Sequence, residues 1–414
     1  MKISGVGVPV AVIAAAALAG EVRAEDGAFQ KAIGETKPLL DLRIRMENVD
    51  QDGIVEDAHA TTVRARFGFE TGKAWNTSLL VEGEGVLPIQ DDYRPDPAVP
   101  TMTSYPVVPD PESYEVNRFQ LTTTAGATTV TLGRQRIALD DQRFVGPVGW
   151  RQNEQTFDAL RIVNKSVKGL TLDATYFTKV NRIFGEDSPQ GDYKGDSGLF
   201  NTAWQTKKAG KITAFGYLLD FENVAGVPAA VRDSTSTYGL RWAGETPAGK
   251  IKLAYALSLA EQSDYADNPL DFDLGYRYGE LTASYQQFSL GYGMEIMEGD
   301  GVKGFTTPLA TLHKFNGWAD KFLGTPPNGI EDRFITAGVT LKKVLGLDSL
   351  ALVAAHHEYD AERVSADYGS EINVSLAAKY KKVSFMLKLA DFDEGVLATA
   401  RTTQKVWAQL EYAW

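Results

Sequence analysis

Apolar and polar residues alternate with a period of two along most of this 414-residue chain. The pattern is clear in residues 38–48, 61–71 and 249–261, where one face of the segment is apolar and the other carries polar or charged side chains. Alternation of this kind is typical of β-strands with two different faces. It predicts eighteen strands, near residues 38–48, 61–71, 76–87, 113–124, 127–137, 154–164, 169–180, 197–207, 210–222, 234–244, 249–261, 270–279, 280–292, 330–342, 348–359, 368–380, 382–393 and 402–414.

The polar face carries charge on strand after strand, and aromatic residues gather near strand ends, as at Tyr276, Tyr278, Tyr412 and Trp414. A soluble sandwich would bury its apolar face and has no need of such aromatic ends. A membrane barrel turns its apolar face to lipid and its polar face to a lumen, and aromatic girdles mark both interfaces. An even strand number also agrees with a bacterial single-chain barrel.

The predicted connections alternate between short and long. Short ones include "NKSVKG" and "TKKAG", and long ones include the connections near residues 88–112, 181–196 and 293–329. Short periplasmic turns and long extracellular loops are typical of outer-membrane barrels. We therefore predict an all-β fold, a transmembrane antiparallel β-barrel of about 18 strands in the bacterial outer membrane. Its lipid would be one partner.

The start of the chain has the features of a secretory signal. Lys2 is followed by an apolar stretch, and the small residues Val22 and Ala24 suit a cleavage site after residue 24. We expect residues 1–24 to be a signal peptide and residues 25–414 to form the barrel, with residues 25–37 as an irregular leader. A formal net charge of −12 argues against nucleic acid as a general partner.

Arginines on the predicted lumen face are the main candidates for function. The lipid face rejects arginine by roughly 2–4 kcal/mol near the midplane, which favours the lumen even where alternation is ambiguous. Rings of arginine favour anions, although carboxylates on the same wall could pair with them and leave ordinary wall charge. Alternation supports Arg43, Arg45, Arg64, Arg66, Arg241 and Arg277 more directly than Arg118, Arg134, Arg136 and Arg161.

Two other patterns suggest calcium binding or hydrolysis, and we compare both with the channel interpretation. In "NVDQDGIVEDAH", Asp50 and Asp52 have the early spacing of a calcium loop, but the twelfth residue is His59 instead of a bidentate Glu. His356 and His357 suggest a barrel hydrolase as an alternative, but the sequence shows no candidate nucleophile to pair with them. We therefore predict no enzyme, no catalytic residue and no cofactor, with a weak calcium contact as the remaining metal alternative.

The block "LGRQRIALDDQRFVGPVGWRQNEQTFDALRI" (132–162), with "HKFNGWADKFLGTP" later in the chain, resembles the alginate export family. This resemblance implies an eighteen-stranded monomeric barrel with an arginine-rich constriction that passes a polyanionic uronate polymer, with periplasmic export partners. Within the matched block it makes Arg134, Arg136, Asp158 and Arg161 candidates for the constriction. The leading hypothesis is a passive channel for anionic oligo- or polysaccharides such as alginate. A general or nutrient-uptake porin is the alternative, and a barrel hydrolase is a weaker one.

One segment departs from the β pattern. In "HKFNGWADKFLGTPPNG", three aromatic residues recur at the spacing of a helix face, and the segment falls in the longest predicted loop. We expect a short helix over residues 313–324 that packs on the barrel wall and narrows the pore as a lid; a free amphipathic surface helix is the alternative. The lid candidates are His313, Lys314, Phe315, Trp318, Lys321 and Phe322.

Overall fold

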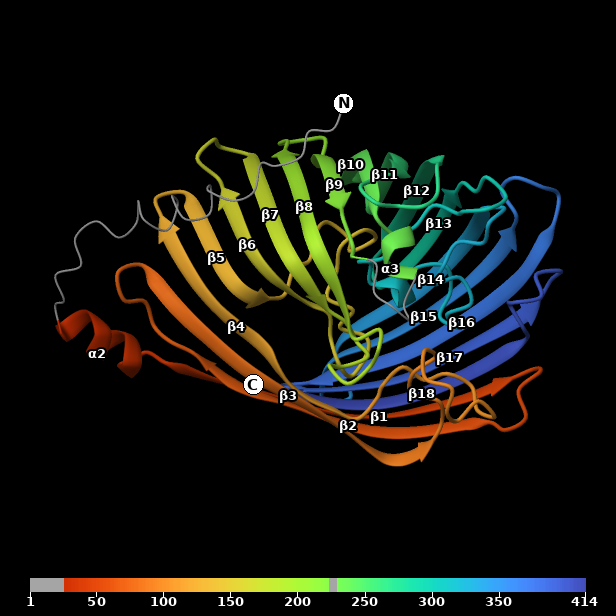
Figure 1. The fold of residues 1–414 in the computed structure, drawn as a ribbon, viewed down its shortest axis with the longest axis horizontal. Coiled ribbons are helices and arrows are strands. Elements are labelled where there is room, and N and C mark those ends of the chain that lie inside the picture. The colour runs from red at the N-terminus through yellow and green to blue at the C-terminus, as the bar shows by residue number, and fades with distance from the viewer. Residues whose placement is uncertain (1–25, 223–228) are drawn as a thin grey trace.

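A closed antiparallel β-barrel of eighteen strands makes up the fold (Figure 1). The computed structural model describes residues 26–222 and 229–414. Each strand pairs with its neighbours in sequence, and β1 pairs with β18 to close the sheet. The strands are β1 (Lys37–Gln51), β2 (Ala58–Glu70), β3 (Thr77–Asp92), β4 (Ser113–Ala125), β5 (Thr128–Gln135), β6 (Thr156–Asn164), β7 (Leu170–Asn181), β8 (Asp192–Gln205), β9 (Lys211–Leu219), β10 (Thr235–Ala248), β11 (Ile251–Asp264), β12 (Asp273–Tyr285), β13 (Phe288–Met297), β14 (Ile330–Val344), β15 (Leu347–Asp360), β16 (Asp367–Tyr380), β17 (Val383–Glu394) and β18 (Thr403–Ala413).

The predicted strand number, closure and alternation of short and long connections are confirmed. One hairpin is shifted: we expected its turn between residues 279 and 280, whereas β12 runs to Tyr285 and β13 begins at Phe288. Gly279 resembles a turn residue in the sequence, but it lies inside the sheet opposite Leu257. The turn is instead made at Gln286, whose φ is 53°.

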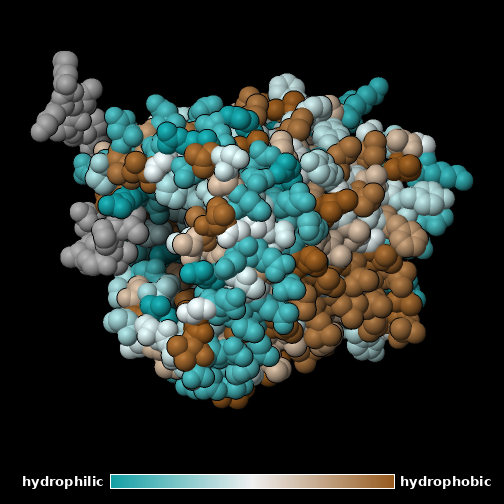
Figure 2. All heavy atoms as spheres, turned by 90° about the vertical axis from the view of Figure 1, so that its right-hand side faces the viewer, coloured by the Kyte–Doolittle hydropathy of each residue, from teal (hydrophilic) through white to brown (hydrophobic). Residues whose placement is uncertain are grey.

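The outer surface of the barrel is apolar where lipid would contact it. In β1, Leu42, Ile44 and Met46 are exposed, whereas Arg43 and Arg45 between them are buried on the lumen side. Figure 2 shows hydrophobic side chains gathered in one broad area of the outer surface, with hydrophilic ones around it. This arrangement matches the predicted membrane barrel.

Helices are few in the described part of the chain, and none there is long and apolar enough to cross a membrane. The expected irregular leader contains α2 (Asp26–Gly34), which lies outside the barrel near its short turns (Figure 1). Its Ala32 carbonyl accepts a hydrogen bond from Gly72 in the β2–β3 turn. The predicted signal peptide, residues 1–24, lies outside the described residues.

Two long loops fold into the lumen and fill much of it. These are the β5–β6 loop (residues 136–155) and the β13–β14 loop (residues 298–329). They bind each other, because Gly146 N donates to Leu309 O at 2.8 Å and the Gln155 side chain donates to the carbonyls of both residues. The main hydrophobic core therefore lies inside the barrel, between these loops and the inward side chains of the strands.

The expected helix over residues 313–324 is wrong. A single 3₁₀ turn, η1 (Leu312–Lys314), begins the segment, and the chain then continues as bends and turns. Asn316, Gly317 and Asp320 have positive φ values of 53°, 82° and 61°, which an α-helix cannot contain. The N–H groups of Trp318 and Ala319 bind the Glu371 carboxylate instead of helix carbonyls. The other short helix, α3 (Ala229–Arg232), lies in the β9–β10 loop.

Candidate substrate pathway

Two cavities lie on opposite sides of a thin partition inside the barrel. The partition is the segment of residues 147–151 in the β5–β6 loop. We call the cavity near the long loops, about 460 Å³, the loop-side cavity, and Val148 and Arg151 line it. The other, about 340 Å³ and bordered by the start of β1 and by Trp414, is the turn-side cavity, and Pro147 and Gly149 line it. A solute that crosses the barrel along these cavities must pass the partition.

Arginines of β1 hold the partition by its backbone. The Arg43 guanidinium donates to the carbonyl oxygens of Gly149 and Arg151 at 3.2 Å each. Arg45 donates to the Trp150 carbonyl, and its guanidinium carbon lies 4.2 Å from the centre of the Trp150 ring. Alternation correctly places Arg43 and Arg45 on the lumen face, but both guanidinium groups are engaged with an inserted loop.

Trp150 is the side chain that fills the partition. It stacks on His313, with ring centres 4.1 Å apart and an angle of 5° between the rings. The Lys388 ammonium lies 4.2 Å from the Trp150 ring and 3.8 Å from the Trp318 ring. Val148 beside it has a φ of 50°, a costly conformation for a β-branched residue, and such strain gathers at functional sites.

A buried chain of polar groups, from β18 through the β13–β14 loop to β17, lies against Trp150 of the partition. Asp320 accepts from Lys405 at 3.1 Å and contacts His313 Nδ1 at 2.7 Å, and Lys388 Nζ lies 2.7 Å from His313 Nε2. Burial lowers the pKa of His313 well below its ordinary value, which Asp320 only partly offsets. The neutral imidazole therefore donates from Nδ1 to Asp320 and accepts from Lys388 at Nε2.

Arg151 ties the partition to three carboxylates. Its guanidinium lies 3.0 Å from Glu47, 3.7 Å from Asp110 and 2.9 Å from Asp320, and all four side chains are buried. Losing one member of such a buried set typically costs about 3–5 kcal/mol, because a charge is left without a partner. Arg151 therefore fixes the partition and is not a free pore cation.

The turn-side cavity has an even balance of charge. Four arginines and four carboxylates line it, and the arginines each have a carboxylate partner. One guanidinium nitrogen of this lining, Arg66 Nη2, is buried without an acceptor among the described protein groups. Nε and Nη1 of Arg64, a β2 residue that does not line the cavity, are buried in the same way. The charged residues that line the cavity are Arg43, Arg66, Arg118, Arg136, Asp41, Glu82, Glu154 and Glu411.

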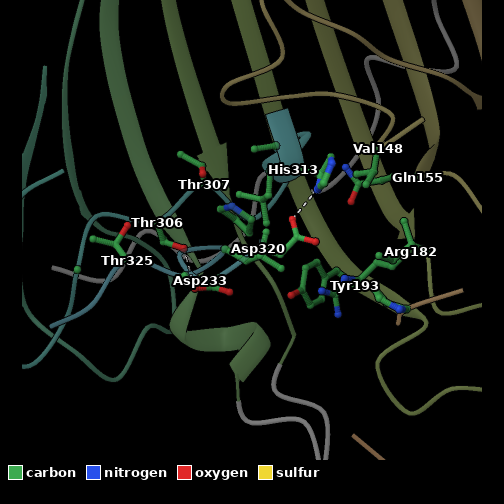
Figure 3. Close-up of a pocket in the computed structure, with 18 of the residues that line it drawn as sticks. Val148, Gln155, Arg182, Tyr193, Asp233, Thr306, Thr307, His313, Asp320 and Thr325 are labelled. Atoms are coloured by element: carbon green, nitrogen blue, oxygen red, sulfur yellow. Dashed lines mark hydrogen bonds and ion pairs between the residues drawn. The ribbon is translucent and has the colours of Figure 1, made fainter. Parts of the chain in front are cut away.

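The loop-side cavity carries one positive charge in excess. Its lining includes Arg151, Arg182 and Lys303 against Asp233 and Asp320, with His313 neutral. Figure 3 shows Arg182 and Tyr193 together at one side of this cavity and Thr306 and Thr325 at the opposite side. His313 and Asp320 point toward each other between them. Sequence reasoning missed Arg182 and Tyr193, because neither lies in a segment with clear alternation.

The expectation that Arg134 and Asp158 line the lumen is wrong, because both face the outer surface. They bind each other at 2.8 Å, and Arg134 pairs across the sheet with Phe119, whose exposed side chain faces outward. Paired residues of an antiparallel ladder point to the same face. Buried Phe157 precedes Asp158 and faces the lumen, so Asp158 faces out. Both lie in a recess of the outer surface with Tyr114 and Glu186.

The expectation that Arg277 faces the lumen is also wrong. Here Leu274 and Tyr276 are buried on the lumen side, and Arg277 points outward beside exposed Leu259 and pairs with Glu298. The apolar face of this half of β12 meets the inserted loops instead of lipid. Alternation gave the two faces of the strand correctly but assigned them to the wrong sides.

The remaining arginine candidates do face the lumen. A β-bulge between Glu82 and Gly83 in the β3–β4 pairing brings Arg118 inward, where it forms two hydrogen bonds with Glu82. Arg136 lies just past β5 and binds Glu154. Arg161 binds Asp173, and Arg241 binds Asp141 at 2.9 Å and Ser258.

The predicted lid residues lie in the lumen, although without a helix. His313 and Phe322 are buried, and Phe322 contacts Tyr359 and Phe392 on the wall. Lys314 is exposed, and Lys321 donates to Gln51 at 3.0 Å. Trp318 contacts Lys388, and Phe315 lies 4.9 Å from the Arg143 guanidinium.

The calcium pattern is a β-hairpin in the structure. Asn48 and His59, the first and twelfth positions, are cross-strand partners, and Asp50 and Asp52 are both exposed. Within residues 26–222 and 229–414, no cluster of three His, Asp or Glu side chains could hold a metal ion. His357 is buried against Asp332 at 2.9 Å, and neighbouring His356 points to the other face.

Comparison with known proteins gives a family match over part of the chain. A family model described as alginate export covers the β4–β13 part of the barrel. Residues 111–294 match the alginate export family. This agrees with the sequence resemblance, whose most specific block lies inside the matched range. No curated protein matches the chain.

Solved structures with the same fold come from Pseudomonas aeruginosa. OccK1 (OpdK) has a TM-score of 0.69 at 14% identity, and OccK9 (OpdG) has 0.71 at 15%; each match covers 92% of this chain and 99% of the other. OccK3 (OpdO) has 0.67 at 13%, covering 95% and 99%. A crystal structure of OpdK with vanillate also has a TM-score of 0.69, with 14% identity and the same coverage of 92% and 99%. At this identity these matches show the fold.

The alginate export match and the apolar outer surface place this barrel in the bacterial outer membrane, as a porin-like channel.

Proposed function

We propose that this channel passes anionic saccharides, uronates among them, through its two cavities. The observation that carries the proposal is the arginine wall of the turn-side cavity, which Arg43, Arg66, Arg118 and Arg136 line. Guanidinium groups bind carboxylates through paired N–H donors, so such a wall suits an acidic sugar. The alginate export match supports the same substrate class.

The balance of charge on the wall determines how strongly the channel prefers anions to cations. Because Arg66, Arg118 and Arg136 each have a carboxylate partner, the wall acts by exchange of carboxylate partners and not through a large net charge. A passing carboxylate exchanges with a wall carboxylate as it moves from one arginine to the next. The resulting anion preference is moderate, and passage is passive.

The pore itself has no direction. Gradients and periplasmic partners at the short-turn end would decide between export and uptake. Since both cavities lie within one chain, a monomer provides the whole pathway.

Planar-bilayer recording of the full chain tests the proposal. In a KCl gradient we expect a reversal potential that favours chloride, and current block by trigalacturonate but not by neutral maltotriose. Arg136→Gln leaves Glu154 with one fewer cation and should shift the reversal potential toward potassium. The matched control is Arg277→Gln, which removes an arginine from the outer face and should change nothing. Cation selectivity at low salt, together with no block by trigalacturonate, would overturn the proposal.

A second candidate is the uptake of small carboxylates. It is favoured by the crystal structure of the related fold OpdK with vanillate, an aromatic carboxylate, and by cavities of about 340 and 460 Å³, which suit a single ring. Liposome swelling distinguishes the two candidates. Faster entry of vanillate than of galacturonate and its oligomers would favour small carboxylates.

A further inference from the structure

The arginines that line the two cavities differ in one respect. Six arginines line them, and five lie within 4.0 Å of a carboxylate oxygen. Arg182, in the loop-side cavity, has no carboxylate within that distance in the described part of the chain. A paired guanidinium must give up its partner to bind an anion, whereas Arg182 keeps that capacity.

Packing holds the Arg182 guanidinium in place. Its central carbon lies 4.1 Å from the centre of the Tyr193 ring and 5.2 Å from that of Phe184. Tyr193 is buried and packs on Phe221 with ring centres 4.7 Å apart, so Arg182 rests on a fixed aromatic support. One Nη1 hydrogen is donated to the Gln190 carbonyl at 3.0 Å. A guanidinium has five N–H donors, and the others are left for a ligand.

The rest of the cavity suits a hydroxylated ring with one carboxylate. Thr306 and Thr325 lie across from Arg182 (Figure 3), and the cavity has one positive charge in excess. The Arg151 guanidinium in the same cavity is already bound by Glu47, Asp110 and Asp320. An incoming carboxylate therefore finds Arg182 as its available partner on this side of the partition.

We propose that Arg182, Phe184 and Tyr193 form a docking subsite for a uronate residue in the loop-side cavity. This deepens the proposed function and rests on it. The subsite would hold an acidic sugar ring at the extracellular face of the partition, while the arginines of the turn-side cavity receive it on the other side of Trp150. It makes uronate binding from the loop side stronger than binding from the turn side.

Sided addition of trigalacturonate to single channels tests the subsite. The chain has no cysteine, so Val364→Cys in the exposed β15–β16 loop reports which side a membrane-impermeant thiol reagent reaches, and hence the orientation of each channel. On this background Arg182→Gln should lower the association constant for loop-side block about tenfold. Arg182→Lys, which keeps the charge but loses the planar donor pair, should recover part of it. Arg277→Gln is the matched control and should bind as the parent does.

Each outcome separates the subsite from the function. Unchanged loop-side block in a folded Arg182→Gln channel overturns the subsite. Wild-type block from the turn side alone also overturns it, yet leaves the uronate channel standing. Absence of block from both sides overturns the subsite, and together with cation selectivity at low salt it overturns the proposed function as well.

Discussion

The two walls of the lumen hold the same inserted loops by opposite means. Strands β1–β3 face inward with charged side chains, and the β1 residues Arg43 and Arg45 bind backbone carbonyls of the partition. Strands β9 and β12 face inward with rings, and Phe215 and Tyr276 lie 4.9 and 5.2 Å from the Phe144 ring. The difference shows that the inward side chains of each wall match the groups of the loop that they contact. Arginine donors lie opposite loop carbonyl oxygens, and aromatic side chains lie opposite the aromatic ring of the loop.

One arginine of the loop connects the two kinds of wall. Arg143 enters the aromatic side, where it binds Glu295 at 2.6 Å and lies 6.0 Å from the Tyr276 ring. Glu295 also accepts from the Tyr276 hydroxyl at 2.7 Å. The aromatic wall therefore contains a buried ion pair of its own, but the cation comes from the loop and the anion from the strand.

The largest effect is expected on the charged wall. Arg45→Ala removes the donor to Trp150 and leaves Asp110 and Glu47 with one fewer cation, at a cost to loop docking of about 3–5 kcal/mol. The partition should then leave the lumen for part of the time, and single-channel conductance should rise severalfold with large fluctuations.

Met46→Ala is the matched control for this change. It shortens the next side chain of the same strand, but on the lipid face, and should leave conductance as it is. If folded Arg45→Ala channels conduct like the parent, then Arg43 and the Trp150 stack hold the partition without Arg45, and the charged wall matters less than we infer.

A smaller effect, of another kind, is expected on the aromatic wall. Tyr276→Phe removes the hydroxyl that donates to Glu295 and keeps the ring against Phe144, so the free energy of unfolding should fall by about 2 kcal/mol. Ion selectivity should stay the same, because Arg143 still neutralises Glu295. Tyr285→Phe, on the exposed outer face of the same strand, is the control for urea unfolding in micelles. A change in reversal potential for Tyr276→Phe would contradict this division between the walls.

Strand positions could be predicted from the sequence because lipid imposes one rule along the whole outer surface. The rule placed Arg43, Arg45, Arg64 and Arg66 on the lumen face correctly. It failed at Arg277, since the extracellular half of β12 meets inserted loops whose rings make the inside as apolar as the outside. Alternation by itself cannot tell which of two apolar surroundings a strand face meets.

The contents of the lumen could not be predicted for a related reason. The partners of Arg43 are carbonyl groups more than a hundred residues away, and no local pattern marks a carbonyl as an acceptor. The aromatic spacing of Phe315, Trp318 and Phe322 imitated a helix, but the Glu371 carboxylate on β16 takes the N–H groups that a helix would use. Both outcomes depend on contacts between distant segments.

The smallest effect is a pH dependence of loop docking on the charged side. Burial, with Lys405 nearby, lowers the pKa of Lys321 from its ordinary 10.5 to about 7. An undocked Lys321 binds more protons than a docked one between these values, so docking is weakest below pH 7 and gains as pH rises toward 10.5. Between pH 7 and 8 the gain is below about 1 kcal/mol, because one pH unit is worth at most about 1.4 kcal/mol and the side chain is partly exposed. Opening events should therefore be rarer at pH 8 than at pH 7.

Lys321→Met should remove this dependence, and Lys314→Met, at an exposed lysine of the same loop, should keep it. The same pH response in Lys321→Met channels would assign it to another group.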